Sequence, residues 1–169
     1  MDRTLLTPRL RLEPLGPDHR GPYRALVRDP RVAATLGGIP DEARIDAMLA
    51  QQAADWERNG FGWSAWLDRE TGEFVGRGGI WRTEVDGRPE VEVGWAVAPQ
   101  RWGQGLATEA GAAHLRDARD THALTGIVSF TRPDNLASRR VMEKLGLEYE
   151  RDFVRKGFPQ VLYRQPVTG

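Results

Sequence analysis

The chain has 169 residues, of which 40% are apolar and 28% charged, a length and balance typical of one globular domain with a single core. Its 24 basic residues offset its 24 acidic ones, and a net charge of zero gives no overall attraction to nucleic acid or to an anionic membrane. The sequence has no cysteine, which excludes disulfide bonds, thiolate zinc sites and cysteine nucleophiles. We therefore expect no nucleic-acid partner and no membrane partner.

The start of the chain and its hydropathy bear on localisation and domain organisation. Met1–Thr4 leads into a strand-like stretch rather than an apolar signal segment, and nowhere do about 18 apolar residues run together. This favours a soluble, cytoplasmic protein. No repeat, low-complexity tract or long linker interrupts the sequence, so residues 1–169 are predicted to form one domain. The three histidines show no metal-ligand spacing, and no metal site is expected.

The first part of the chain predicts one strand and two helices. Residues 10–13 alternate between apolar and charged, as in a half-buried strand. A short helix over residues 23–27 should end before Pro30. A second helix should begin at Asp41 and stop at Gly60. Its apolar stripe consists of Ile45, Met48, Leu49, Gln52 and Trp56.

Three strands are predicted next, over residues 61–67, 74–81 and 91–98. The turn signals between them are Glu70–Gly72 and the dipeptide Asp86-Gly87, which is a strong hairpin signal. We expect the tryptophans of this region to be core residues rather than an acceptor cage; they are Trp56, Trp63, Trp66 and Trp81.

After Pro99 the pattern predicts a helix from about residue 106 to 119, a strand over 127–131, a helix over 135–144 and two strands within 149–165. Hairpins come first and crossover helices later. The predicted fold class is therefore α/β (α+β), with a mixed, mostly antiparallel sheet of about seven strands flanked by about four helices.

The most informative segment, residues 93–110, reads as a strand, a turn with two glycines and the start of a helix. Glycines allow close approach of the backbone to a ligand, and the free N–H groups of a helix N-terminus favour an anion such as phosphate or pyrophosphate. A Walker loop is excluded because Gly-Lys-Ser/Thr is missing. A dinucleotide fingerprint is disfavoured because Thr108 stands where a third small residue is needed.

The turn sequence Gln100-x-x-Gly103-x-Gly105 resembles the signature of the GNAT superfamily of N-acetyltransferases. The neighbouring segments 6–12, 92–95, 102–110 and 135–147 resemble the RimJ/RimL branch, which includes ribosomal-protein N-terminal acetyltransferases. The resemblance implies a GNAT-like fold with a splayed central strand pair. It also implies transfer of an acetyl group from acetyl-CoA, the cosubstrate, to an amine.

The resemblance further implies where coenzyme A binds. Its pyrophosphate would be held by backbone amides of the turn, at Arg101, Trp102, Gly103, Gln104, Gly105, Leu106 and Ala107. Pantetheine would lie along Ala96, Val97 and Ala98 like an extra strand, in a gap opened by a bulge, and an N–H near Val97 would stabilise the oxyanion. Trp102 could instead pack under the turn.

Two residues of the last predicted helix are implied as further contacts. Asn135 and Ser138 match positions that hydrogen-bond the pantetheine arm or approach the sulfur, and their spacing places them on one helix face. Asn135 could also serve as the helix cap.

The implied catalytic residues are Glu92 and Ser138. Glu92 is the candidate general base for the amine, and Glu90, on the same strand face, is its alternative; either could instead be a surface charge. Many GNAT enzymes carry a tyrosine acid where this chain has Met142, so Ser138 is the nearest replacement. Direct attack in a ternary complex is expected.

Two questions stay open at this level. A non-catalytic acyl-CoA sensor with the same fold is the alternative function. The acceptor could be a peptide N-terminus or a small amine, and a homodimer, common among relatives, is neither required nor excluded.

Overall fold

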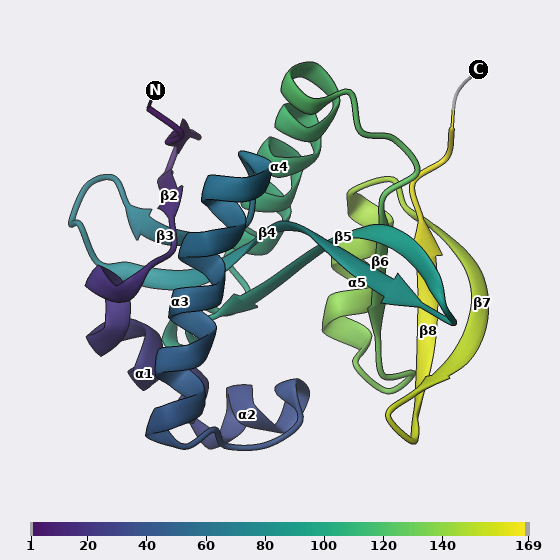
Figure 1. Cartoon of the computed structure of the whole chain (residues 1–169), viewed down its shortest axis with the longest axis horizontal. Coiled ribbons are helices and arrows are strands. Elements are labelled where there is room, and N and C mark those ends of the chain that lie inside the picture. Colours follow the sequence, from purple (N-terminus) through teal and green to yellow (C-terminus); the bar gives the residue numbers. More distant parts are fainter. Residues whose placement is uncertain (1, 168–169) are drawn as a thin grey trace.

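The computed structural model describes residues 2–167, and Figure 1 shows their arrangement. The strands are β1 (Leu5–Leu6), β2 (Leu10–Pro14), β3 (Trp63–Asp68), β4 (Phe74–Val85), β5 (Arg88–Val97), β6 (Val128–Thr131), β7 (Glu148–Arg155) and β8 (Phe158–Arg164). The α-helices are α1 (Arg20–Arg28), α2 (Pro30–Leu36), α3 (Glu42–Asn59), α4 (Leu106–His122) and α5 (Leu136–Lys144). Two short 3₁₀ helices are η1 (Pro17–His19) and η2 (Pro99–Arg101).

The strands form one open sheet in the order β1-β2-β3-β4-β5-β6-β8-β7. Every neighbouring pair is antiparallel except β5 and β6, which are parallel. The predicted mixed, mostly antiparallel sheet is therefore confirmed.

The structure has one more strand and one more helix than predicted. Strand β1 has only two residues and was not expected. Helix α2 begins at Pro30. The sequence predicted that the first helix ends before this proline, but it predicted no helix directly after it. Proline suits the first position of a helix because its missing N–H needs no partner there, and the Asp29 side chain caps the helix by accepting from the N–H of Arg31 at 2.9 Å.

The β3-β4-β5 meander follows the predicted turns. Gly72 at the first turn has φ +77°, and Asp86 and Gly87 at the second have φ +50° and +78°. Two successive positive values are typical of the tight hairpin turn that Asp-Gly favours. This turn fixes the β4–β5 register, in which Trp81 pairs with Glu92.

Helices cover both faces of the sheet (Figure 1). Helices α1 and α3 pack on one face through a cluster that includes Tyr23, Ile45 and Leu49. Helix α4 packs on the other face, where the fully buried Trp66 lies among Leu residues of β2 and α4. A second cluster on that face joins α4 and α5 to β4, β5 and β8.

The central strands β5 and β6 separate after a single contact. Strand β5 has 10 residues, yet it pairs with β6 only at Glu92 and Val128. All four residues of β6 pair with β8, so β6 follows β8 away from β5. The predicted splay is confirmed, but the predicted bulge in β5 is wrong: its register with β4 runs without a shift from Val85–Arg88 to Gly76–Val97.

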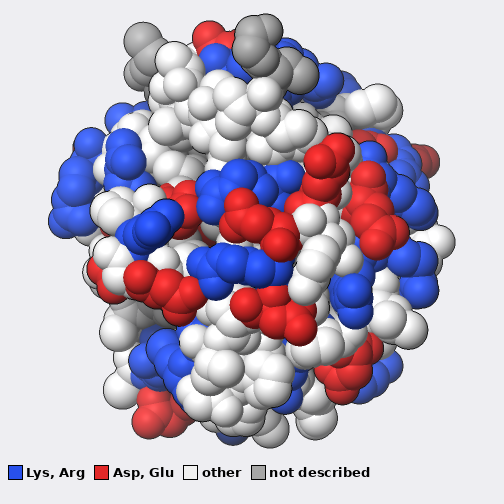
Figure 2. Space-filling model, turned by 90° about the vertical axis from the view of Figure 1, so that its right-hand side faces the viewer, with Lys and Arg blue, Asp and Glu red and all other residues white. Residues whose placement is uncertain are grey.

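The face on the β7–β8 side shows basic and acidic side chains next to one another rather than a patch of one sign (Figure 2). Among the ion pairs of these strands, Arg164 contacts Glu90 and Glu150 at 2.8 Å each, and Arg151 contacts Asp86 at 2.7 Å. No helix within residues 2–167 combines the length and the apolar character that a membrane crossing requires.

Candidate active site

The glycine turn between β5 and α4 has the backbone geometry of an anion site. Gly103 has φ +74° and Gly105, the N-cap of α4, has φ +77°, values that glycine adopts far more readily than other residues. The backbone N–H groups of Arg101 and Trp102 donate to the carbonyls of Ala98 and Pro99, at 2.8 and 3.2 Å, so, contrary to the prediction, they are not free to bind a phosphate. Among the hydrogen bonds of residues 2–167, none has a backbone N–H of residues 103–107 as its donor. These N–H groups lie at the positive end of the α4 dipole, and a Cβ added at Gly103 would meet open space.

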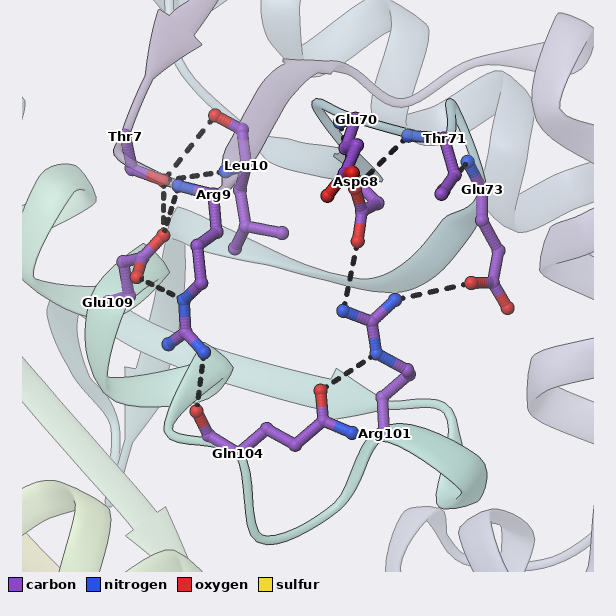
Figure 3. A network of polar contacts seen from close by, with 10 residues as sticks. All are labelled: Thr7, Arg9, Leu10, Asp68, Glu70, Thr71, Glu73, Arg101, Gln104 and Glu109. Atoms are coloured by element: carbon purple, nitrogen blue, oxygen red, sulfur yellow. Dashed lines mark hydrogen bonds and ion pairs between the residues drawn. The ribbon is translucent and has the colours of Figure 1, made fainter.

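Side chains from the N-terminal half hold this turn in place (Figure 3). On one side, Arg101 contacts Asp68 at 3.0 Å and Glu73 at 3.2 Å, both near the β3–β4 turn. Its Nε also donates to the side-chain oxygen of Gln104 at 2.9 Å. The turn is thereby fastened to the β3–β4 hairpin.

A second set of contacts holds the other side of the turn (Figure 3). Arg9 donates to the Gln104 carbonyl at 2.8 Å and to the Glu109 carboxylate at 2.8 Å. The same carboxylate accepts from the Thr7 hydroxyl at 2.6 Å and from the Arg9 backbone N–H at 3.0 Å. The turn is rigid while its N–H groups stay free, an arrangement that fits a pyrophosphate.

The edge of β5 next to the turn is also unpaired. Ala98 donates its N–H to Val75 O of β4 at 2.8 Å, so alternation directs the N–H and C=O of Val97 to the opposite edge, toward β6. Because β6 has already diverged, Val97 has no strand partner there. Its carbonyl accepts instead from the Trp102 indole at 2.7 Å.

Ala96, Val97 and Ala98 are therefore not equivalent. Ala96 and Ala98 direct their backbone polar groups toward β4, and their side chains pack on α1 and α2. Of these three residues, Val97 alone presents a backbone N–H to the opening between β5 and β6. This fits an extended chain, such as pantetheine, lying along that edge.

A cleft of about 740 Å³ lies where β5 and β6 separate. It is lined by Glu92 and Trp95 of β5, which point to opposite faces of the strand, so the cleft extends through the sheet. Asn135, Ser138 and Met142 of α5 line it as well. The structure therefore brings Glu92, Asn135 and Ser138 to one cavity, while the glycine turn lies outside its lining.

Glu92 is the buried acid of this cleft. The residue is 8% exposed, and burial raises its pKa to about 8, although Arg155 and Arg77 partly offset that effect. Within the described part of the chain, the carboxylate accepts no hydrogen bond. Glu90 is different, because both its oxygens bind Arg164, at 3.0 and 2.8 Å, and it does not line the cleft. The geometry favours Glu92 over Glu90 as a proton acceptor.

The α5 residues combine a structural role with access to the cleft. Asn135 caps the helix: its side-chain oxygen accepts from the Ser138 N–H at 3.3 Å, and its Nδ2 donates to the Thr131 hydroxyl at 3.0 Å. Ser138 is half-buried, and its hydroxyl has no protein partner among residues 2–167. Met142 is 1% exposed and part of the core, so this position offers no acid.

Two tryptophans expected in the core line the cleft instead. Trp66 and Trp56 are core residues, as predicted. Trp63 and Trp81 are only partly buried and meet edge to face at 5.0 Å in the cleft. The position of Trp81 beside the site could have been predicted, because the register set by Asp86-Gly87 places Trp81 opposite Glu92 on the same face. Tyr23 and Arg77 line the same cleft, although no sequence pattern marked either as a site residue.

His114 is not part of the site. It is 3% exposed on α4, near Trp66, and burial lowers its pKa to about 4. It is therefore neutral at physiological pH.

Comparisons with known proteins agree with this geometry. Residues 9–148 match the acetyltransferase (GNAT) domain family. The chain belongs to the GNAT acetyltransferase family. GNAT acetyltransferases use acetyl-CoA, and this chain is accordingly an acetyl-CoA-dependent acyltransferase.

Three relatives illustrate the range of similarity. An FsC-acetyl coenzyme A-N(2)-transacetylase from Aspergillus fumigatus is 34% identical over 164 residues, which cover 90% of this chain and 68% of that protein. The structure of an acetyltransferase from Agrobacterium tumefaciens is 30% identical, with a TM-score of 0.84 over 97% of this chain and 94% of its own. A ribosomal-protein-S5-alanine acetyltransferase from Vibrio fischeri is 13% identical, with a TM-score of 0.78 over 96% and 95% of the two chains, which shows a shared fold alone.

Proposed function

We propose that this GNAT protein is an N-acetyltransferase that acetylates a primary amine by direct attack in a ternary complex, with Glu92 as general base. One observation carries the proposal. A buried carboxylate without a hydrogen-bond partner lies in the cleft between β5 and β6, on the strand whose free edge presents the Val97 N–H.

The amine must lose a proton before it can attack. An α-amino group has a pKa of about 8 and a lysine amine about 10, so both are largely protonated at neutral pH. Glu92 accepts this proton, directly or through one water, because its raised pKa of about 8 makes it a stronger base than an ordinary carboxylate. Its cleft shields the pair from bulk solvent.

The remaining groups bind acetyl-CoA and polarise its thioester. Acetyl-CoA supplies the acyl group as an activated thioester. The N–H groups of residues 103–107 hold its pyrophosphate, and Val97 donates its N–H to the carbonyl oxygen as negative charge develops there. Asn135 and Ser138 line the cleft beside the pantetheine path, and the Ser138 hydroxyl stabilises the departing thiolate, a fairly good leaving group.

The proposal also covers the chain as a whole. Residues 1–169 act as one catalytic domain with no further cofactor. The acceptor is a small amine or a protein N-terminus: the Aspergillus fumigatus relative is named as an N(2)-transacetylase, and the Vibrio fischeri protein as acting on a ribosomal-protein alanine. The segments that resemble the RimJ/RimL branch favour a protein N-terminus. The higher sequence identity to the Aspergillus fumigatus relative favours a small amine.

The test is a thiol-release assay with acetyl-CoA and a panel of peptide N-termini and small amines, together with calorimetric titration of CoA. Glu92→Gln should lower kcat about 10²–10⁴-fold with unchanged CoA affinity. The wild-type rate should rise with pH through about 8, and Glu92→Gln should lose this inflection. Because the acceptor amine also titrates, a second acceptor with a different amine pKa should leave the Glu92 inflection in place.

Glu90→Gln is the matched control on the same strand, and it should retain most activity because Glu90 is paired with Arg164 outside the cleft. CoA binding without amine-dependent thiol release would favour the acyl-CoA sensor. A Glu92→Gln enzyme with the wild-type pH profile would reject Glu92 as the base.

A further inference from the structure

We propose that the acceptor amine carries a carboxylate, which Arg77 and Arg44 bind beside Tyr23 while the amine lies at Glu92. This inference rests on the proposed function and specifies its substrate. Its evidence is the position of Arg77 and Arg44 in the cleft and their lack of ion-pair partners among residues 2–167.

Arg77 is the central observation. It lies on β4, it is only 5% exposed, and it lines the cleft. Within residues 2–167 its guanidinium makes no hydrogen bond and no ion pair, and its Nε is buried without a partner. A buried cation without a partner is strongly unfavourable, so an anion supplied by a ligand would satisfy it.

The surrounding side chains hold the Arg77 guanidinium in position. Its central carbon lies 4.0 Å from the centroid of the Trp63 ring, a cation–π contact. Trp63 in turn meets Trp81 edge to face. Trp81 lies over Gly94, where a Cβ would come within 2.6 Å of the indole. This stack places a fixed guanidinium in the wall of the cleft, which favours a planar, bidentate anion.

Arg44 and Tyr23 complete the subsite from the helices. Both line the same cleft, Arg44 from α3 and Tyr23 from α1. Burial raises the pKa of Tyr23, and the charges of Arg77 and Arg44 partly offset this effect. Among residues 2–167, Arg44 has no acidic side chain as an ion-pair partner. Two cations and one hydroxyl therefore line the same cleft.

The β4–β5 register relates this subsite to the base. Arg77 pairs with Ala96, and Trp81 pairs with Glu92, on the same face of the sheet. Between these two rows lies the pair Gly79–Gly94, which has no side chains. The rows are four residues apart, or about 13 Å between Cα atoms, and the Trp81 indole lies over Gly94 between them. An acceptor would thus span several ångströms between its amine and its anion.

The charge of the cleft differs from that of the rest of the molecule. In a chain with no net charge, the cleft is lined by five basic and two acidic residues; they are Arg44, Arg77, Arg132, Arg155 and Lys156, and Asp41 and Glu92. By contrast, basic and acidic side chains alternate on the outer face shown in Figure 2. This excess of positive charge disfavours polyamines and aminoglycosides and favours an anionic acceptor.

The experiment compares acceptors that differ only in the anionic group. The small-molecule arm uses 4-aminobutanoate, its amide and 1,4-diaminobutane. The peptide arm uses C-terminally amidated Ala-Asp and Ala-Asn. The carboxylate member of each set should show a kcat/KM about 10–100-fold higher, as expected for hydrogen bonds to a charged group. If only the small molecules, or only the peptides, show this preference for the carboxylate, the acceptor belongs to that class.

The variants assign the effect to Arg77. Arg77→Met keeps the packing on Trp63 but removes the charge, and it should abolish the preference for the carboxylate over the uncharged amide. Its Tm should equal or exceed that of the wild type, because an unpaired buried charge is removed; a purely structural arginine would lower Tm. Arg82→Gln, an exposed change on the same strand outside the cleft, is the control.

A binding measurement keeps the test independent of turnover. In the protein saturated with CoA, 4-aminobutanoate should change the fluorescence of the Trp63–Trp81 pair, and Arg77→Met should lose this response. Equal use of amide and carboxylate, preference for 1,4-diaminobutane, or no carboxylate binding at millimolar concentration would overturn the inference. If thiol release that depends on Glu92 persists in that case, the transferase assignment stands and only the anion subsite is refuted.

Discussion

The indole N–H of Trp102 donates to the carbonyl of Val97 at 2.7 Å, although the Trp102 side chain is half-exposed. The bond joins the glycine turn to the free edge of β5. It also occupies the Val97 carbonyl, so that Val97 offers a ligand on that edge its N–H alone. The two parts of the proposed CoA site are thus held in a fixed relation.

Trp102→Phe should raise the KM for acetyl-CoA about 3–10-fold, because a typical hydrogen bond contributes about 1 kcal/mol. Steady-state kinetics with acetyl-CoA as the varied substrate measures this. Trp56→Phe removes an indole–carbonyl bond of the same length, 2.7 Å to Trp63 O, in helix α3. It should lower Tm and leave the KM for acetyl-CoA unchanged; equal KM effects of both changes would contradict the prediction.

Gly105→Glu should lower CoA affinity at least about 100-fold. It places a side chain and a negative charge among the free N–H groups of the turn, at a residue with φ +77°. Gly87→Glu is the matched control, because Gly87 has φ +78° and the backbone strain is therefore the same; a Cβ at Gly87 would meet no atom within 4 Å, and one at Gly105 would meet only Arg9, at 3.6 Å. Calorimetry should find normal CoA binding for Gly87→Glu, and a Gly105→Glu protein with normal affinity would reject the pyrophosphate assignment.

Glu92→Gln should change the pH dependence of stability as well as activity. The ordinary pKa of the carboxyl is 4.5, and in the folded protein it is about 8, so the folded state holds a proton that the unfolded state has lost. Stability should therefore fall as pH rises from about 4.5 to about 8.

The glutamine variant removes this dependence. It should be more stable than the wild type by a few kcal/mol at pH 9, since one pKa unit corresponds to about 1.4 kcal/mol, and nearly equal to it at pH 4. Urea unfolding at both pH values measures the difference. A stability change of the same size at pH 4 and pH 9 would show that the pKa of Glu92 is the same in the folded and unfolded states.

Asn135→Asp separates the two roles of this residue. Aspartate is as good an N-cap as asparagine, so the bond to the Ser138 N–H and the Tm should survive. The side-chain N–H donor is lost, and a negative charge enters the pantetheine path. CoA affinity should fall about 10-fold while Tm changes little, whereas Asn135→Ala should lower both. Unchanged CoA affinity in the aspartate variant would leave Asn135 as a cap alone.

The local signals in the sequence predicted most of the sheet and the helix boundaries. Asp41 and Gly60 bound α3, and Asp86-Gly87 sets the hairpin register, because caps and tight turns depend on only a few neighbouring residues. The two-residue strand β1 and the seven-residue α2 were missed because segments this short carry almost no periodicity.

The cleft was harder to foresee. A tryptophan in a strand has the same local pattern whether it faces a core or a cavity, so the sequence does not distinguish Trp66, which packs against α4 on one face, from Trp63, which lines the cleft on the other. The resemblance to acetyltransferases pointed to Glu92, but the missing partners of Arg77 depend on side chains from three distant elements. The expected bulge was wrong because β6 separates by following β8.

The contacts of Glu109 with Thr7 and Arg9 join residues about 100 positions apart in the chain. Closing so long a loop carries a large entropic barrier, which slows folding and places such contacts late in it. During synthesis, the first strands leave the ribosome long before the turn that they support, so the turn proposed to bind CoA can be completed only after α4 has been synthesised. Shortening the chain by its first nine residues would thus disable a site that lies a hundred residues downstream.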